Sequence, residues 1–269
     1  MQIIKINTLG IKFLLMFICI AGKNKCAVDA IKFLFRRKIN KRRILALPTD
    51  DDNGKDDWQP SLKKFARENK IKITKLKKLY NIEDLFFFSL EYDKIINIKK
   101  FKTKNLFNLH FSLLPKYRGC HTNFLQILKG EKFSGVTLHK IDNGIDTGPI
   151  IDQIKFRIKI NDTAYDNYKK LMNYSTRLFK KNLKRVVSHK YSLRKQILSN
   201  GSYFSRTSVN YKKEIKINIK KNSLKNHNKI RSLIFPAYQY PFVNGVKVIK
   251  SIYKNKKIYL IKSSDYKFI

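Results

Sequence analysis

Two short runs of this sequence carry side chains that are suited to group-transfer chemistry. The run NLHFSLLPKYRG at 108–119 places the amide of Asn108 two positions before the imidazole of His110. The run DNGIDTGPIID at 142–152 carries the carboxylate of Asp146 between two glycines. When an acyl group passes from one nitrogen to another, the attacking amine loses a proton and the carbonyl oxygen becomes negative. An amide and an imidazole suit those needs, and a carboxylate can hold the imidazole in one tautomer or accept a proton through water.

The local pattern also predicts the elements that position these side chains. The run LFNLHFSLLP alternates apolar and polar residues, which indicates a strand that carries Asn108 and His110 on one face and stops at Pro115. Glycines and short polar residues around Asp146 indicate a loop whose backbone can pass close to a ligand. Each residue alone is also an ordinary strand-end or turn residue. Because all three occur in two long runs, we expect the strand end and the loop to converge on one site.

Together the two runs resemble the formyltransferases that take a formyl group from N10-formyltetrahydrofolate, a family that includes methionyl-tRNA, glycinamide ribonucleotide and nucleotide-sugar formyltransferases. The resemblance begins near Met16 and covers nearly all of the remaining chain. It implies that Asn108, His110 and Asp146 form the catalytic trio. Pro149 stands where the family often has an acidic residue, a change that removes one N–H without affecting the trio.

The remaining sequence alternates short apolar runs with segments of helical apolar spacing, which predicts an α/β fold with a doubly wound, mostly parallel sheet. The resemblance implies the Rossmann-like formyltransferase form of this fold. We expect an N-terminal extension at 1–15, a catalytic domain at 16–188 and a small β-rich region at 189–269. Residues 11–21 also resemble a signal peptide, but cleavage there would remove a predicted central strand. The turns Asn244-Gly245 and Asn255-Lys256 predict a small antiparallel sheet near the C-terminus.

Ligands of open α/β sheets lie beyond the carboxyl ends of the strands, which places the loop after DLFFFSL beside the predicted site. The resemblance implies that the pterin of the folate is held there, with cofactor-binding residues Leu90, Glu91, Tyr92, Ile145 and Asp146. The segments WQPSL and IRSLIFPAYQYP resemble the enzymes that formylate a nucleotide-linked 4-amino-4,6-dideoxyhexose. Aromatic and amide side chains are suited to stack on a thymine and to hydrogen-bond it. The predicted substrate-binding residues are Trp58, Gln59, Lys116, Arg118, Tyr203, Phe235, Tyr238 and Gln239.

Composition narrows the function classes. The chain has 269 residues and a formal net charge of +40, which in isolation favours a nucleic-acid or anionic partner. The basic residues are spread along the chain and mixed with Ile and Asn, whose codons are also A/T-rich, so composition drift is the preferred explanation. The three cysteines lack disulfide or zinc spacing, which fits a reducing cytoplasm. No dinucleotide or P-loop glycine motif is present, and His139 is interpreted as a strand-face residue.

The sequence therefore predicts a cytoplasmic enzyme that formylates a nucleotide-linked amino sugar, preferably a dTDP-4-amino-4,6-dideoxyhexose used for O-antigen or another surface glycan. N10-formyltetrahydrofolate is the expected co-substrate, without a metal, a membrane partner or a stable nucleic-acid partner, and the resemblance implies a homodimer. Two alternatives stay open. A formyltransferase that acts on methionyl-tRNA or another amine is supported by the net charge and opposed by the missing β-barrel domain. A non-catalytic anion-binding or nucleic-acid-binding module is the third hypothesis.

Overall fold

The computed structural model describes residues 16–265, so the predicted extension at 1–15 lies outside the described residues. The chain divides into two compact units. The described part of the first unit runs to His110 and includes Val136–Gln153 and Met172–Ile197. The second unit contains Phe111–Gly135, Ile154–Leu171 and the chain from Leu198 onward. The two units are interleaved in sequence. The predicted boundary between residues 188 and 189 separates two consecutive regions of the chain, and that boundary stays a prediction.

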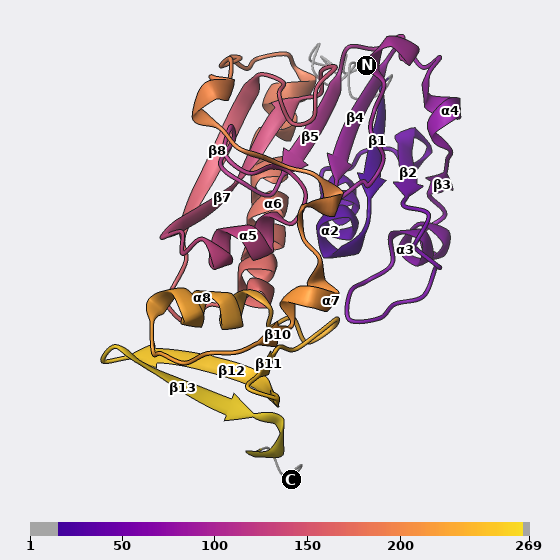
Figure 1. Cartoon of the computed structure of the whole chain (residues 1–269). Coiled ribbons are helices and arrows are strands. Elements are labelled where there is room, and N and C mark those ends of the chain that lie inside the picture. Colours follow the sequence, from indigo (N-terminus) through magenta and orange to yellow (C-terminus); the bar gives the residue numbers. More distant parts are fainter. Residues whose placement is uncertain (1–15, 266–269) are drawn as a thin grey trace, which may run out of the picture. The chain divides into compact units, whose positions relative to one another are not determined.

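Within residues 16–265, seven strands form one sheet in the order β3, β2, β1, β4, β5, β7, β8 (Figure 1). The strands are β1 (Phe17–Gly22), β2 (Ile44–Pro48), β3 (Lys72–Ile73), β4 (Leu85–Leu90), β5 (Leu106–His110), β7 (Phe133–Lys140) and β8 (Ile150–Arg157). Neighbouring strands from β3 to β5 are parallel, and β7 is antiparallel to β5. The prediction of a mostly parallel α/β sheet is confirmed.

The two faces of the sheet bury alternate side chains of β4. Phe88 faces two helices, α2 (Asn24–Arg36) and the part of α6 (Ala164–Val187) that belongs to the first unit. Its ring lies 5.1 Å from that of Phe179 on α6, and Phe179 lies 6.3 Å from Phe33 on α2. The period-two alternation of a strand turns the neighbouring Phe87 to the opposite face. A strand that is apolar on both faces is typical of a sheet covered on both sides.

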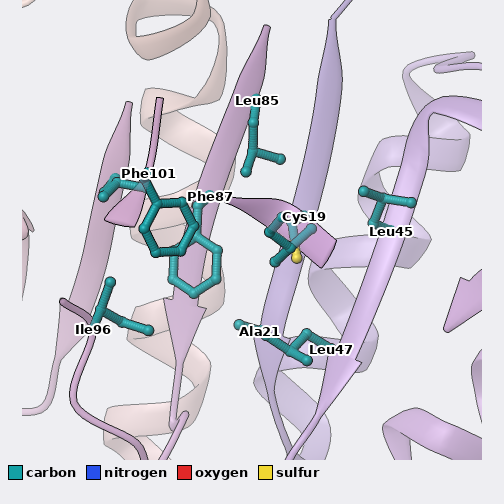
Figure 2. Close-up of a cluster of buried hydrophobic side chains, with 10 residues drawn as sticks. Cys19, Ala21, Leu45, Leu47, Leu85, Phe87, Ile96 and Phe101 are labelled. Atoms are coloured by element: carbon teal, nitrogen blue, oxygen red, sulfur yellow. The ribbon is translucent and has the colours of Figure 1, made fainter. Parts of the chain in front are cut away.

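On the opposite face, β1, β2 and β4 share a cluster of buried side chains with the loop that follows β4 (Figure 2). Phe87 contacts Phe101 edge to face, with ring centroids 5.9 Å apart. Full burial of each such side chain contributes about 1.5–3 kcal/mol, so this cluster anchors the loop to the sheet. The labelled members are Cys19, Ala21, Leu45, Leu47, Leu85, Phe87, Ile96 and Phe101.

The strand register aligns four loops at one edge of the sheet. Gly22 at the end of β1 pairs with Pro48 of β2 and with Leu90 of β4, and Leu90 pairs with Leu109 of β5. The loops that follow these four strands therefore begin at the same level as His110. Only glycine fits at position 22, because an added Cβ would lie 1.7 Å from the carbonyl oxygen of Leu90. This is the edge where ligands of open α/β sheets bind.

Local capping explains where the helices begin. Ser61 caps α3 (Leu62–Glu68), because its Oγ accepts a hydrogen bond from Lys64 N at 2.9 Å. Thr163 and Asp166 form a reciprocal capping pair at the start of α6, with Asp166 N to Thr163 Oγ1 at 3.1 Å. Shorter helical segments are α4 (Leu76–Leu79), η1 (Lys41–Arg43), η2 (Ile98–Lys100), η3 (Leu198–Asn200), η4 (Arg206–Ser208) and η5 (Ser263–Asp265).

The second unit has its own core, built around α5 and α8 and extended by a four-stranded sheet in the order β10, β11, β12, β13. Its elements are β6 (Arg118–Gly119), α5 (Thr122–Leu128), β9 (Tyr203–Phe204), α7 (Tyr211–Glu214), β10 (Lys216–Ile217), α8 (Leu224–Ser232), β11 (Phe242–Val243), β12 (Val246–Lys254) and β13 (Lys257–Lys262). The predicted turns at 244–245 and 255–256 connect antiparallel strands, so the expected small sheet is confirmed. The parallel pairing of β10 with β11 is an addition that the sequence pattern did not indicate.

Candidate active site

The structure brings the three predicted catalytic side chains together in the first unit. Asn108 and His110 lie on β5, and Asp146 lies in the loop between β7 and β8. Asp146 Oδ1 accepts a hydrogen bond from Asn108 Nδ2 at 3.0 Å. The other carboxylate oxygen, Oδ2, lies 3.3 Å from His110 Nδ1. The carboxylate thus bridges the amide and the imidazole, both of which occupy the same face of β5.

A fourth side chain, His139, belongs to this cluster. It sits on β7 directly opposite Asn108, and its Nε2 lies 3.2 Å from Asn108 Nδ2 and 3.5 Å from Asp146 Oδ1. Its Nδ1 lies 2.8 Å from the carbonyl oxygen of Lys140. Because a carbonyl only accepts, Nδ1 carries the proton, and Nε2 of the neutral ring accepts from Asn108. The interpretation of His139 as a mere strand-face residue was therefore incomplete.

The antiparallel pairing of β5 with β7 is what brings His139 to this cluster. The sequence predicted both strands but not their antiparallel pairing, and that pairing sets Asn108 opposite His139. A cross-strand pair on one face of a sheet brings Cβ atoms within about 5.5 Å, so the pairing alone predicts the contact.

The loop that carries Asp146 is held by bonds of its own. Asp142 Oδ1 accepts from Thr147 Oγ1 at 2.7 Å and from Gly144 N at 3.1 Å. Lys140 N donates to the carbonyl oxygen of Pro149 at 3.0 Å, which closes the base of the loop. Asp146 itself adopts the left-handed conformation with φ of 55°. This conformation lets the loop reverse direction and return the carboxylate to β5.

The predicted folate-binding residues of the loop after β4 start at the level of His110, because Leu90 pairs with Leu109. Leu90 is buried, and its carbonyl oxygen accepts from Lys23 N at 3.3 Å. Glu91 is left-handed with φ of 60°, and its Oε2 accepts from Asn24 Nδ2 at 3.1 Å. Tyr92 packs against the core, and burial raises its pKa to about 12, so the phenol is neutral at physiological pH.

Ile145, the remaining predicted folate residue, is exposed and directly precedes Asp146. An exposed aliphatic side chain beside the trio can cover one face of a flat ring. An apolar side chain beside a few polar groups is typical of a site for a small ligand. The residues present are therefore compatible with a reduced folate at this edge.

Trp58 and Gln59 lie in the loop that follows β2, at the same edge of the first unit. Gln59 Oε1 accepts a hydrogen bond from Lys25 N at 3.2 Å, in the first turn of α2. The N-cap residue of α2 makes no side-chain cap bond. Gln59, which lies outside the helix, therefore satisfies one of the free N–H groups at the start of α2. The loop is also tied by ion pairs from Asp51 to Lys23 at 2.6 Å and from Asp50 to Lys94 at 2.7 Å. These ion pairs join the acidic run at 50–57 to the loops that follow β1 and β4.

Two of the predicted substrate residues of the second unit are brought together by a short strand pair. Arg118 of β6 lies opposite Tyr203 of β9, and Tyr203 is 48% exposed. Lys116 lies two residues before Arg118, and its N donates to the carbonyl oxygen of Leu113 at 3.2 Å. A guanidinium is suited to contact phosphates, and an accessible ring is suited to stack on a base.

Phe235 does not offer a face to a ligand as predicted, because it is only 7% exposed. Its ring packs against those of Tyr165 and Tyr168 at 5.2 and 5.5 Å and is stacked by Tyr238 at 5.1 Å. Tyr238 is 71% exposed and is the ring of this cluster that can stack on a base. Gln239 N donates to the carbonyl oxygen of Phe235 at 2.8 Å, which fixes the turn that presents Tyr238.

Comparison with known proteins places this site in a family. Residues 68–183 match the family model described as formyl transferase. WlaRD, a sugar 3N-formyl transferase solved with dTDP and 5-N-formyl-THF, shares 50% identity with this chain and a TM-score of 0.86. The match covers 90% of this chain and 87% of WlaRD. The chain belongs to the formyltransferase family.

A second solved formyltransferase, the enzyme from Helicobacter canadensis in complex with folinic acid and dTDP-3-aminofucose, is 46% identical to this formyltransferase. The match covers 90% of this chain and 89% of that enzyme, with a TM-score of 0.85. A methionyl-tRNA formyltransferase from Clostridium thermocellum has a TM-score of 0.59 at 18% identity, a similarity that concerns the fold alone.

Curated relatives of this formyltransferase are longer. The bifunctional polymyxin resistance protein ArnA of Wigglesworthia glossinidia brevipalpis is 32% identical over 78% of this chain and 34% of its own length. The methionyl-tRNA formyltransferase of Malacoplasma penetrans is 31% identical over 73% of this chain and 64% of its own length. This formyltransferase therefore spans about a third and about two thirds, respectively, of these two relatives.

Two further observations concern the described part of this formyltransferase, residues 16–265. No cluster of three or more His, Cys, Asp or Glu side chains in that range is arranged to hold a metal ion. In the same range, no helix combines the length and the apolar character needed to span a bilayer. Its cysteines, Cys19, Cys26 and Cys120, are free thiols.

Proposed function

We propose that this chain transfers a formyl group from N10-formyltetrahydrofolate to the amino group of a dTDP-linked amino sugar. The observation that carries the proposal is the Asp146 carboxylate bridging Asn108 and His110 at the edge where four strand-end loops align. It is supported by the two solved relatives at 46–50% identity, which are sugar formyltransferases associated with dTDP and formylated folates.

The solved relatives bear most directly on which ring position of the sugar carries the acceptor amine. The sequence pattern favours a 4-amino sugar, whereas the relatives at 46–50% identity are named for 3-amino acceptors. A 4-N-formyltransferase from Francisella tularensis is 19% identical to this chain, so it informs only the fold. We therefore include dTDP-3-amino-3,6-dideoxyhexoses as the first acceptors to test.

The proposed roles follow from the contacts of each side chain. Asp146 Oδ2 holds His110 by Nδ1, which directs the opposite ring nitrogen, Nε2, away from the carboxylate. His110 can then donate to the formyl oxygen as negative charge develops, or take the proton of the acceptor amine. Asn108 can act as a second donor to that oxygen only by releasing His139 Nε2 or Asp146 Oδ1, the two acceptors that its amide protons meet in this structure. Loss of one such donor costs about 3–4 kcal/mol of barrier in comparable sites.

The folate, when bound, supplies the formyl carbon. The acceptor nitrogen forms a bond to that carbon, the bond from carbon to N10 breaks, and one proton passes from the acceptor amine to N10. The carboxylate of Asp146 lies within reach of both His110 and Asn108, so it can stabilise a positively charged imidazole during this proton transfer. Because Asp146 is acceptor-only when ionised, it also keeps the Asn108 amide turned with its nitrogen inward.

The proposal includes a cytoplasmic location, a homodimer and use of the product in lipopolysaccharide or another surface glycan. The homodimer and the use in a surface glycan are carried over from the family resemblance, whereas the location rests on the spacing of the cysteines. Light scattering would measure the assembly, and a mass near that of one 31.9 kDa chain would contradict the homodimer.

The function is tested by incubating the protein with N10-formyltetrahydrofolate and a panel of dTDP- and UDP-linked 3-amino and 4-amino sugars. Release of tetrahydrofolate measures turnover, and NMR of the product places the formamide on the ring. We expect turnover with a dTDP-amino sugar. Turnover with methionyl-tRNA at physiological salt, without turnover of any amino-sugar nucleotide, would contradict the proposal.

Methionyl-tRNA remains the second candidate acceptor, because of the net charge of +40 and the 31% identical relative that formylates it. Binding driven by phosphate contacts weakens steeply with salt, by about 10³–10⁵ between 50 and 200 mM for 6–10 contacts. We expect weak tRNA binding that is lost as salt rises, while sugar formylation survives because stacking on Tyr238 is not screened. Absence of turnover with any amine acceptor would favour the third hypothesis, a non-catalytic binding module.

A further inference from the structure

Gln196 is a buried residue whose side chain contacts the loop that carries Asp146. It lies in the first unit, in the segment that follows α6, and is only 6% exposed. Its Nε2 donates to the carbonyl oxygen of Asp146 at 3.0 Å and to that of Gly148 at 2.7 Å. Both protons of the amide are therefore used on the backbone of one loop. The sequence pattern gave no reason to select this residue.

These two bonds act on the backbone conformation that aims the Asp146 carboxylate. Asp146 is left-handed with φ of 55°, a conformation that costs about 1–2 kcal/mol for a residue other than glycine. Asp142 fixes the first half of the loop through Gly144 and Thr147, whereas Gln196 fixes the second half. The two N–H groups of Gln196 Nε2 hold the carbonyl groups of Asp146 and Gly148 at a set distance. An apolar side chain of equal size has no N–H group and cannot do this.

The segment that presents Gln196 is itself fastened to β8. Arg194 and Ile150 exchange two backbone hydrogen bonds, each of 2.8 Å. The Arg194 guanidinium donates to Gln153 Oε1 at 2.7 Å. Gln196 is therefore a fixed point two residues beyond a strand bridge, and it can resist movement of the loop. In enzymes, a misplacement of about 1 Å at the reacting groups can cost about 10²-fold in rate.

We propose that Gln196 is a positioning residue for formyl transfer, which holds the Asp146 loop so that the carboxylate stays against His110 Nδ1. The inference rests on the proposed function, because it assigns Gln196 to the same site. Gln196 acts through the loop backbone and is not itself in contact with the reacting groups by this account.

The first test removes the donors without changing the size of the side chain. In Gln196→Met we expect kcat to fall about 10-fold to 100-fold, with KM for both substrates within about threefold of wild type, since transition-state positioning is what is lost. Arg194→Met is the matched control, because it removes the side-chain bond to Gln153 but keeps the backbone bonds to Ile150 and both bonds from Gln196 to the loop. We expect its kcat to stay within about threefold of wild type. A wild-type kcat in Gln196→Met, or an equal loss in Arg194→Met, would overturn the inference.

The second test uses Gln196→Glu and does not depend on how well the methionine variant folds. An ionised carboxylate would face two carbonyl oxygens, whereas a protonated one restores a donor. The kcat of Gln196→Glu relative to wild type should therefore rise at least about threefold as pH is lowered from about 8.5 to about 6. A ratio that does not change with pH would overturn the assignment even if both variants are less active.

Hydrogen exchange separates this inference from the proposed function. Amides of residues 142–148 should exchange faster in Gln196→Met than in wild type or in Arg194→Met, whatever reaction the protein catalyses. Unchanged exchange in the loop would refute the positioning role. By contrast, a wild-type protein that formylates no acceptor, but whose loop exchange depends on Gln196, would refute only the proposed function.

Discussion

Asn108 and His139 lie directly opposite each other on β5 and β7, with Asn108 Nδ2 only 3.2 Å from His139 Nε2. The same amide nitrogen donates to Asp146 Oδ1 at 3.0 Å. Both amide protons therefore meet protein acceptors, one on a fixed imidazole and one on a carboxylate. His139 and Asp146 together determine which way the amide of Asn108 is turned, because a reversed amide would set its oxygen against both acceptors.

Loss of His139 should impair turnover by freeing that amide. We expect His139→Ala to lower kcat about 10-fold to 100-fold with little change in KM, whereas His139→Gln keeps an acceptor and recovers part of the loss. Steady-state kinetics measure both. His189→Gln, the same change at an exposed histidine of the first unit, serves as the control and should be silent. Equal activity of His139→Ala and wild type would exclude the positioning role.

The trio itself should be required for chemistry more than for binding. Asn108→Ala, His110→Ala and Asp146→Asn should each lower kcat by about 10²–10⁴. Binding of dTDP, measured by calorimetry, should be nearly unchanged in all three variants. The Asp146→Asn substitution keeps the size of the side chain but removes the charge that holds the imidazole. Any of these variants that retains full turnover would not belong to the mechanism.

Trp58 offers a direct probe of the loop after β2, because the chain contains one tryptophan. If this loop contacts the nucleotide sugar, selective excitation of Trp58 should show a saturable emission change on addition of dTDP. Gln59→Ala should weaken that binding, since Gln59 ties the loop to Lys25 of α2. Saturable binding by calorimetry with unchanged Trp58 emission would place the nucleotide elsewhere.

Replacing Gly22 should destabilise the first unit. An added Cβ would lie 1.7 Å from the carbonyl oxygen of Leu90, and φ is 147°. We expect Gly22→Ala to reduce the free energy of unfolding by about 2–4 kcal/mol, because the overlap meets backbone that cannot move aside. Urea unfolding measures the loss. Gly245→Ala is the comparison, because Gly245 also has a positive φ, of 84°, but no atom lies within 4 Å of the position of an added Cβ. We expect its free energy of unfolding to fall by only about 1 kcal/mol. Equal losses would show that the Gly22 contact is unimportant.

The buried ring of His227 should lower the free energy of unfolding in mild acid. The ring is fully buried between Ser251 Oγ at 2.8 Å and the carbonyl oxygen of Ile160 at 2.9 Å. Burial lowers its pKa below the ordinary value of 6.5, and the charge of Arg231 adds to this. Below 6.5 the unfolded chain binds a proton more readily than the folded protein does, so the free energy of unfolding decreases as pH falls toward the lowered pKa.

The measurement is urea unfolding at about pH 7.5 and about pH 5.5 for wild type and His227→Gln. We expect the stability loss between the two pH values to be smaller in His227→Gln than in wild type. A His227→Gln variant with the same acid dependence as wild type would contradict this assignment.

Local sequence patterns determined the elements and the chemistry of the trio. The alternating run around Asn108 and His110 became β5, the apolar run before Glu91 became β4, and the glycine-rich run became the loop of Asp146. Strand and cap signals act over a few residues, so short windows of sequence contain the information that sets them. The chemistry of an amide, an imidazole and a carboxylate is likewise a property of the residues themselves.

Tertiary structure decided which distant residues support that chemistry. His139 enters the site through antiparallel register, and Gln196 reaches the loop only because its segment pairs with Ile150. Phe235, which the sequence suggested for stacking, is covered by Tyr165, Tyr168 and Tyr238. Strand register and side-chain burial depend on contacts between residues far apart in the chain, and a local pattern does not contain them. The sequence by itself determined what the trio can do, while the packing determined what holds it in place.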